Sequence, residues 1–101
     1  DAILIRAIEP IDGLEIMQLR TMKKSSKKIT SGPGKLSKAL GINITMNKEK
    51  LTGNKIWIEN YKDSSIFKIV KKPRIGISYS EEDANLKWRF YIKDNHYVSI
   101  N

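Results

Sequence analysis

Two features of this sequence have the residue types that could bind an anionic substrate or act on it. The first is the run Ser31-Gly32-Pro33-Gly34-Lys35, which is predicted to begin a helix. Unpaired backbone N–H groups at such a start favour an anion, the glycines let a phosphate approach closely, and Lys35 adds a positive charge. The spacing of a Walker phosphate-binding loop is absent. The same residues could also form a plain loop and helix start, so both interpretations stay open.

Arg6 is the second feature, because it lies in the middle of the apolar run Ala2-Ile3-Leu4-Ile5-Arg6-Ala7-Ile8. A buried guanidinium is costly unless it is paired and hydrogen-bonded. The pattern leaves two interpretations open. Arg6 could form a structural ion pair, or it could be a site arginine whose carboxylate partner comes from a segment outside this chain.

The charge balance favours a polyanionic partner. The chain has 101 residues, with 19 Lys and Arg against 11 Asp and Glu, and a formal net charge of +8. An excess of this kind is typical of nucleic-acid-binding proteins. No acidic residue lies between Glu15 and Glu49, and residues 20–38 of that interval hold a basic block of seven residues: Arg20, Lys23, Lys24, Lys27, Lys28, Lys35 and Lys38. The block could neutralise phosphates, or it could be a solvated face with no ligand.

The composition argues against several other kinds of site and partner. Cysteine is absent and His96 is the one histidine, which excludes disulfides, thiol nucleophiles and Cys/His zinc sites. We expect no metal and no cofactor. His96 lies in Asp-Asn-His-Tyr, which predicts an exposed polar residue in a turn rather than a catalytic base. No apolar stretch is long enough to cross a bilayer, so we expect no membrane partner.

Local patterns predict the elements that would position these residues. A strand over residues 2–9, apolar on both faces, would end at Pro10. A helix would then run from Gly13 to about residue 23, with Asp12 as its N-cap and Glu15 completing a capping box.

A second helix is predicted over residues 33–40, with Pro33 in its first turn and Gly41 ending it in the left-handed conformation. The remaining sequence predicts strands over 55–59, 67–70 and 88–92, short apolar segments at 75–77 and 97–100, and an acidic loop at 81–83.

This order of elements predicts an α+β domain with a mixed or antiparallel sheet and two short helices. The length allows one small domain. Because the chain begins at Asp1, directly before an apolar strand, we expect residues 1–101 to be a single partial domain, the C-terminal portion of a longer protein.

Three blocks in order resemble the methylpurine (3-methyladenine, alkyladenine) DNA glycosylases. They are Leu-Ile-Arg-Ala-Ile-Glu-Pro-Ile-Asp-Gly at 4–13, Ser-Gly-Pro-Gly-Lys-Leu-Ser-Lys-Ala-Leu-Gly-Ile at 31–42, and Pro-Arg-Ile-Gly-Ile at 73–77. Trp-Arg-Phe-Tyr-Ile at 88–92 and Tyr-Val-Ser at 97–99 resemble the family's closing segment. The resemblance covers nearly the whole chain and would correspond to the C-terminal half of such an enzyme.

The resemblance implies that the protein excises alkylated purines of the 3-methyladenine type from double-stranded DNA, as a monomer and without a metal or cofactor. Water hydrolyses the N-glycosidic bond and leaves an abasic site, the first step of base excision repair. The family's catalytic glutamate and base-binding aromatic residues lie in its N-terminal half, so we expect this chain alone to be inactive. The protein would be cytoplasmic and nucleoid-associated in a bacterium, or nuclear in a eukaryote.

The resemblance also assigns site residues. Arg6 matches the arginine that helps hold the nucleophilic water, and Ile75 matches a position whose main-chain carbonyl contacts that water. Ser31, Gly32 and Lys35 match the loop that grips the DNA backbone. Ile44 departs from the family pattern, since some relatives have a lysine there.

Two other classes of function remain as alternatives. A non-catalytic basic nucleic-acid-binding module would need only the basic block and the Gly-Pro-Gly helix start. A small structural or assembly protein, such as a ribosome-associated domain, would carry the same charge with no chemistry of its own.

Overall fold

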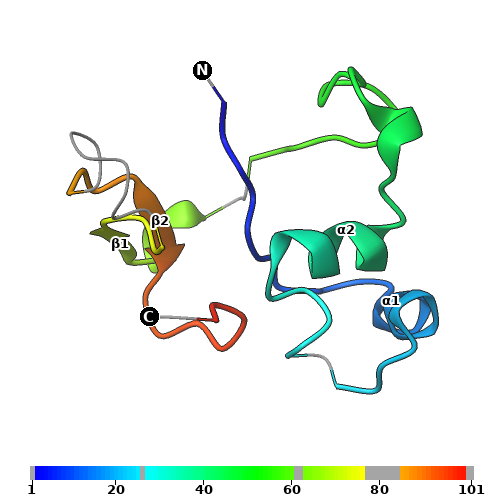
Figure 1. The fold of residues 1–101 in the computed structure, drawn as a ribbon, viewed down its shortest axis with the longest axis horizontal. Helices are drawn as coiled ribbons and strands as arrows, with labels where there is room; N and C mark the ends of the chain where they lie inside the picture. The colour runs from blue at the N-terminus through cyan, green and yellow to red at the C-terminus, as the bar shows by residue number, and fades with distance from the viewer. Residues whose placement is uncertain (1, 26, 61–62, 77–84, 100–101) are drawn as a thin grey trace. The chain divides into compact units, whose positions relative to one another are not determined.

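The computed structural model describes residues 2–25, 27–60, 63–76 and 85–99. These residues form the predicted α+β architecture, with two short helices and an antiparallel pair of strands (Figure 1). They divide into two compact units. The first holds the described residues of Asp1–Lys62 and His96–Ser99, and the second holds those of Asp63–Asn95.

Helix α2, Pro33–Leu40, has the bounds that the sequence predicts. Pro33 occupies the first turn, where its missing N–H costs nothing. Gly41 ends the helix with a φ of 69°, and its N–H lies near the Ser37 and Lys38 carbonyls. Leu36 and Ala39 are the buried side chains of this helix.

Helix α1, Leu14–Thr21, is shorter than predicted, and its start differs from the expected capping box. The N-cap is Gly13, with a φ of 77°, and no side chain of the described residues caps this helix. The expected N-cap, Asp12, therefore lies one residue too early to bond the first-turn N–H groups. At the other end, Met22 adopts a φ of 55° and ends the helix before residue 23.

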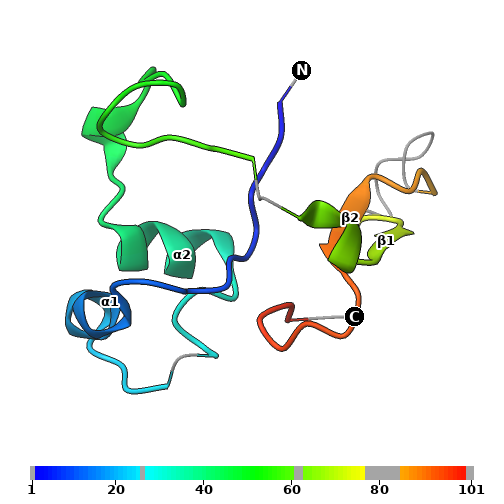
Figure 2. The ribbon, with the colours of Figure 1, turned by 180° about the vertical axis from the view of Figure 1, so that it is seen from behind.

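The two helices of the first unit pack side by side around a small core (Figures 1 and 2). Met17, Ile29 and Ala39 form its buried centre, with Leu14 and Leu40 packed against it. The core therefore joins α1, α2 and the loop that connects them.

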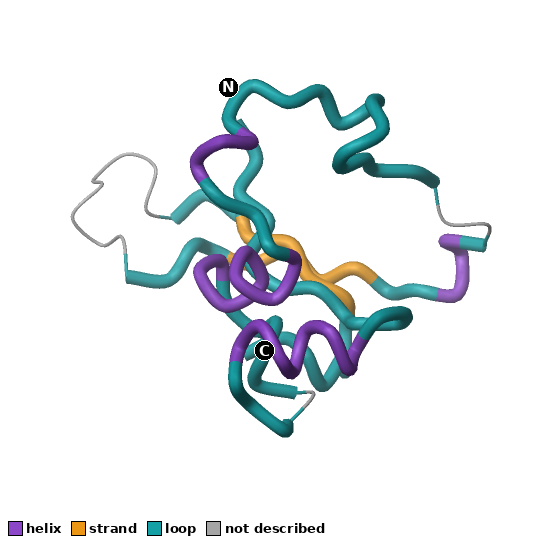
Figure 3. The backbone as a smooth tube through the Cα atoms, turned by 90° about the vertical axis from the view of Figure 1, so that its right-hand side faces the viewer, coloured by secondary structure: helices purple, strands orange, loops and turns teal. Residues whose placement is uncertain are grey.

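The strand expected over residues 2–9 is not formed, which corrects the prediction (Figure 3). Ile3 is 93% exposed, and Leu4 and Ile5 are also exposed. A strand needs a continuous ladder to a neighbour. Among the described residues this segment forms one backbone bond of that kind, from the Ile8 N–H to the Thr30 carbonyl at 3.2 Å. The apolar faces of the segment have no covering layer in the described chain.

The strand expected over 55–59 is also absent and is replaced by a single antiparallel bridge between Thr52 and Trp57. The Ile58 N–H donates to the Leu51 carbonyl at 3.0 Å beside it. One bridge of this kind makes a turn rather than a strand. A short 3₁₀ helix, η1 at Ile44–Met46, precedes it.

The second unit holds the strands β1, Ile69–Lys72, and β2, Arg89–Ile92, which pair antiparallel with Ile69 opposite Ile92. They confirm the strands predicted at 67–70 and 88–92, with β1 shifted by two residues. A 3₁₀ helix, η2 at Ser64–Ile66, comes before β1. Just beyond the ends of this pair, the Arg74 guanidinium lies 5.3 Å from the centroid of the exposed Trp88 ring.

Three predicted segments fall wholly or partly outside the described residues. The acidic loop at 81–83 lies outside them. Of the segment 75–77, the described Ile75 and Gly76 form a turn, and Ile77 lies outside. Residues 97–99 form no strand, and Ile100 lies outside the description.

Candidate functional site

The start of α2 is the feature that brings most of the predicted site residues together. Gly32 is the N-cap, with extended backbone at φ −173° and ψ 156°, and no described side chain caps the helix. Pro33 has no N–H, so Gly34 and Lys35 carry the first free backbone donors. The first turn has no acidic residue. The dipole and the two N–H groups therefore favour an anion here.

Lys35 adds its charge at the same place. A Cβ built on Gly32 would lie 3.8 Å from the Lys35 Cδ atom, so the aliphatic stem of Lys35 lies against the Gly32 backbone. Lys35 is exposed, while Ser31 and Gly32 are half-buried. The predicted phosphate-binding residues thus form one continuous surface at the start of a helix.

Thr30 joins this surface to the segment that carries Arg6. Its side chain is fully buried, and its hydroxyl donates to the Ile8 carbonyl at 2.8 Å. Its own carbonyl accepts the Ile8 N–H at 3.2 Å. Arg6 lies two residues before Ile8, and Ser31 directly follows Thr30. Sequence reasoning missed this contact because nothing local predicts which residue pairs with Ile8.

Arg6 is exposed, which corrects the expectation of a buried guanidinium. The predicted burial depended on a covered strand, and that strand is not formed. No hydrogen bond or ion pair engages Arg6 among the described residues, so the structure gives no support to a structural ion pair. Its interpretation as a site arginine stays a prediction.

Ile75 belongs to the second unit and lies in a turn just after β1. Its side chain is 53% exposed, and Gly76 follows with a φ of 74°. No described residue donates a hydrogen bond to its main-chain carbonyl. The role predicted for this carbonyl also stays a prediction.

One member of the basic block has a structural role. The Arg20 guanidinium donates to the Ala39 carbonyl at 3.0 Å and lies beside Gly41 at the end of α2. It therefore ties α1 to α2. The block's lysines are exposed: Lys23, Lys24, Lys27, Lys28, Lys35 and Lys38.

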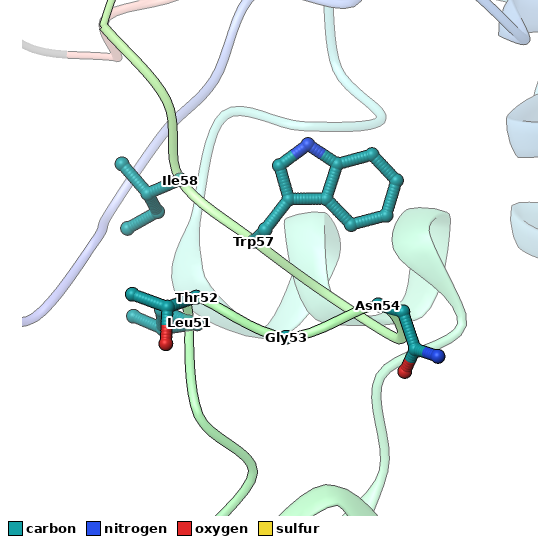
Figure 4. Close-up of a pocket in the computed structure, with 6 residues that line it drawn as sticks. All are labelled: Leu51, Thr52, Gly53, Asn54, Trp57 and Ile58. Carbon is teal, nitrogen blue, oxygen red and sulfur yellow. The ribbon is translucent and has the colours of Figure 1, made fainter.

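An open depression of about 420 Å³ lies elsewhere in the first unit (Figure 4). Its lining is Leu51, Thr52, Gly53, Asn54, Trp57 and Ile58. The lining has no titratable side chain, and it includes none of the predicted site residues. Trp57 and Ile58 project to different sides of their segment in Figure 4.

The described residues hold no group of three or more His, Asp or Glu side chains that could bind a metal ion. Within the same part of the chain, no helix combines the length and the apolar character needed to span a membrane.

A family model and the curated relatives that match this chain point to one protein family. Residues 1–96 match the family model described as methylpurine-DNA glycosylase. A protein of Natranaerobius thermophilus is 44% identical over 104 residues, a match covering 100% of this chain and 52% of that protein. A protein of Clostridium acetobutylicum is 44% identical over 108 residues, covering 99% of this chain and 52% of its own length. Both carry the name "Putative 3-methyladenine DNA glycosylase". The chain spans about half the length of the curated relatives it matches.

Proposed function

Because this chain belongs to the methylpurine-DNA glycosylase family, we propose that its protein hydrolyses the N-glycosidic bond of alkylated purines, of the 3-methyladenine type, in double-stranded DNA. The activity is proposed for a protein of the relatives' length, of which this chain would be the C-terminal portion and inactive alone. That protein would act as a monomer at the bacterial nucleoid. The observation that supports the proposal best is the pair of hydrogen bonds between Thr30 and Ile8, which connects the Arg6 segment to the start of α2.

In the proposed reaction a water molecule attacks the anomeric carbon of the damaged nucleotide. The new C–O bond forms as the N-glycosidic bond breaks, and the bond's electron pair leaves with the base. A carboxylate outside this chain takes the proton from the water as general base. The base must first leave the helix stack, at a cost of a few kcal/mol.

Arg6 would hold the attacking water together with that carboxylate. Its guanidinium is always charged, and its exposure leaves it free to bind a partner from outside the described residues. The Ile75 main-chain carbonyl would accept a hydrogen bond from the same water. Both groups would act only in the longer protein.

Ser31, Gly32 and Lys35 would bind a phosphate of the DNA backbone near the lesion. The support is the uncapped start of α2 and the position of Lys35 against Gly32. Phosphate contacts of this kind position the protein on the duplex and carry no sequence information.

The test is an abasic-site assay on alkylated duplex DNA with the protein expressed from its whole reading frame. We expect excision of 3-methyladenine by that protein and loss of excision on Arg6→Ala. A complete protein that binds the duplex but leaves the alkylated purines in place would overturn the proposal.

A non-catalytic basic module is the second candidate function, and the exposed lysines of the basic block favour it. It predicts that this chain alone binds undamaged duplex, with an affinity that falls steeply as salt rises. Each phosphate contact makes the slope of log K against log salt more negative by about 0.9. Tight but salt-independent binding, or none at all, would rule out this candidate.

A further inference from the structure

We propose that Thr30 is a positioning residue for the reaction, holding the Arg6 segment and the phosphate-binding start of α2 in one fixed arrangement. This inference rests on the proposed function, because it assigns Arg6 to the water and Ser31, Gly32 and Lys35 to the phosphate. Thr30 would touch neither the DNA nor the water.

The contact between Thr30 and Ile8 has two hydrogen bonds. The Thr30 hydroxyl donates to the Ile8 carbonyl at 2.8 Å, and the Ile8 N–H donates to the Thr30 carbonyl at 3.2 Å. Both polar groups of Ile8 are therefore held by one residue. No other backbone bond to a distant segment anchors the described part of residues 2–12.

The loop side of this contact is itself firmly anchored. Thr30 is fully buried, and its neighbour Ile29 is fully buried in the core with Met17 and Ala39. Ile29 thus fixes the loop to both helices. Through its two hydrogen bonds to Ile8, Thr30 holds the Arg6 segment against this anchored loop, although the apolar side chains at Ile3–Ile5 are themselves exposed.

The contact lies close enough along the chain to Arg6 and to Ser31 to fix the position of one relative to the other. Arg6 is two residues from Ile8, or about 7 Å along an extended chain. On the other side of the contact, Ser31 directly follows Thr30, and Gly32 comes next. A shift at Ile8 would therefore move the guanidinium relative to the phosphate-binding surface. Misplacement of a reacting group by about 1 Å can cost about a hundredfold in rate.

The hydroxyl is the part of Thr30 that this role needs. Thr30→Val keeps the volume and branching but leaves the Ile8 carbonyl unpaired. Thr30→Ser keeps the hydroxyl and removes only a methyl group. Thr21→Val is the matched control, because Thr21 is also buried and its hydroxyl also donates at 2.8 Å, but to Met17 within α1.

The experiment uses the protein expressed from its whole reading frame, under conditions where each variant is folded by circular dichroism. Three quantities are measured for each variant. They are the single-turnover rate of 3-methyladenine excision, the salt slope of duplex binding, and hydrogen exchange at the Ile8 amide. A Lys35→Gln background is included, alone and with Thr30→Val.

We expect Thr30→Val to slow excision at least about tenfold, since a displaced reacting group has a large effect on rate. Its salt slope should stay unchanged, because Ile29 still anchors the loop to both helices and Lys35 keeps its place at the start of α2. Lys35→Gln should lower the magnitude of the slope by about 0.9, with or without Thr30→Val. Thr30→Ser should restore the excision rate, and Thr21→Val should leave it unchanged. A purely structural role would lower the melting temperature of Thr30→Val but leave the excision rate of the folded protein unchanged, which would overturn the proposal.

The amide measurement keeps the inference testable if Thr30→Val does not fold. In the wild-type protein, the Ile8 amide should exchange much more slowly than the amide of Ile5 and should slow further on DNA binding. Exchange at Ile8 as fast as at Ile5 would overturn the inference. A protein with no excision activity but with the expected Ile8 protection and salt slopes would overturn the proposed reaction and the catalytic part of this role, and would leave only the contact that holds the two segments together.

Discussion

Substitution of Arg6 should separate an effect on the excision rate from an effect on the free energy of unfolding. Its side chain is exposed and contacts no hydrogen-bonding or ionic partner among the described residues. We expect Arg6→Ala to change the free energy of unfolding of this chain by less than about 0.5 kcal/mol, as for other surface positions. In the longer protein it should lower the excision rate by about a hundredfold or more, as removal of an electrostatic stabiliser does.

Urea denaturation of the chain and single-turnover excision by the longer protein measure these two effects. Lys50→Ala is a suitable control, because Lys50 is exposed and outside the proposed site. Arg6→Lys keeps the charge but loses the planar fork, so we expect it to recover only part of the rate. If Arg6→Ala unfolded the chain and Arg6→Lys restored it, the structural ion-pair interpretation would replace the catalytic one.

At the scale of elements, Gly34 in α2 should show opposite effects on stability and binding. A Cβ built on Gly34 meets nothing within 4 Å, and its φ is not left-handed. We therefore expect Gly34→Ala to stabilise the chain by about 0.4–1 kcal/mol, because alanine has less backbone entropy to lose on folding. The same methyl group would stand beside the free N–H groups and weaken duplex binding. Thermal unfolding and a binding titration would test both, and unchanged DNA affinity would count against a phosphate at this position.

Substitution of Gly41, at the other end of α2, should lower the stability of the chain. Its φ is 69°, and an added Cβ would lie 3.1 Å from the Arg20 guanidinium carbon. We expect Gly41→Ala to destabilise the chain by about 1–2 kcal/mol from the left-handed backbone alone. Displacement of Arg20 from the Ala39 carbonyl would add to the loss. The combination with Arg20→Ala should cost less than the sum of the two, and a strictly additive cycle would show that the contact has no energetic role.

The elements also show what could be predicted from sequence. Helix α2 has its start and stop signals within a few residues, Pro33 and Gly41, so its bounds were predictable. Alternation predicted β1 and β2, although their register depends on distant residues. The strand at 2–9 failed because a strand needs a neighbour that no local pattern supplies. The position of Ser31, Gly32 and Lys35 at the start of α2 was predictable for the same reason. The exposure of Arg6 and the contact of Thr30 with Ile8 were not.

At the scale of the whole molecule, the exposed apolar segment at the start of the chain requires an explanation. Ile3 is 93% exposed, and Leu4 and Ile5 are also exposed. Large exposed apolar patches usually mark surfaces that another layer covers. The chain spans about half the length of its curated relatives. We expect the segment to be a covered strand in the longer protein, as its sequence pattern predicts.

Ile3→Asp tests whether this segment is covered, because its effect on the free energy of unfolding should differ between the present chain and the longer protein. In the present chain the side chain is exposed, so the substitution should change the free energy of unfolding by less than about 0.5 kcal/mol. In the longer protein, burial of an unpaired carboxylate should cost several kcal/mol. Asp12→Ala, at an exposed position outside both helices, is the control and should have a small effect in both proteins. Equal small effects of Ile3→Asp in the two proteins would show that the segment stays uncovered, and the strand at 2–9 would then be wrong for the longer protein as well.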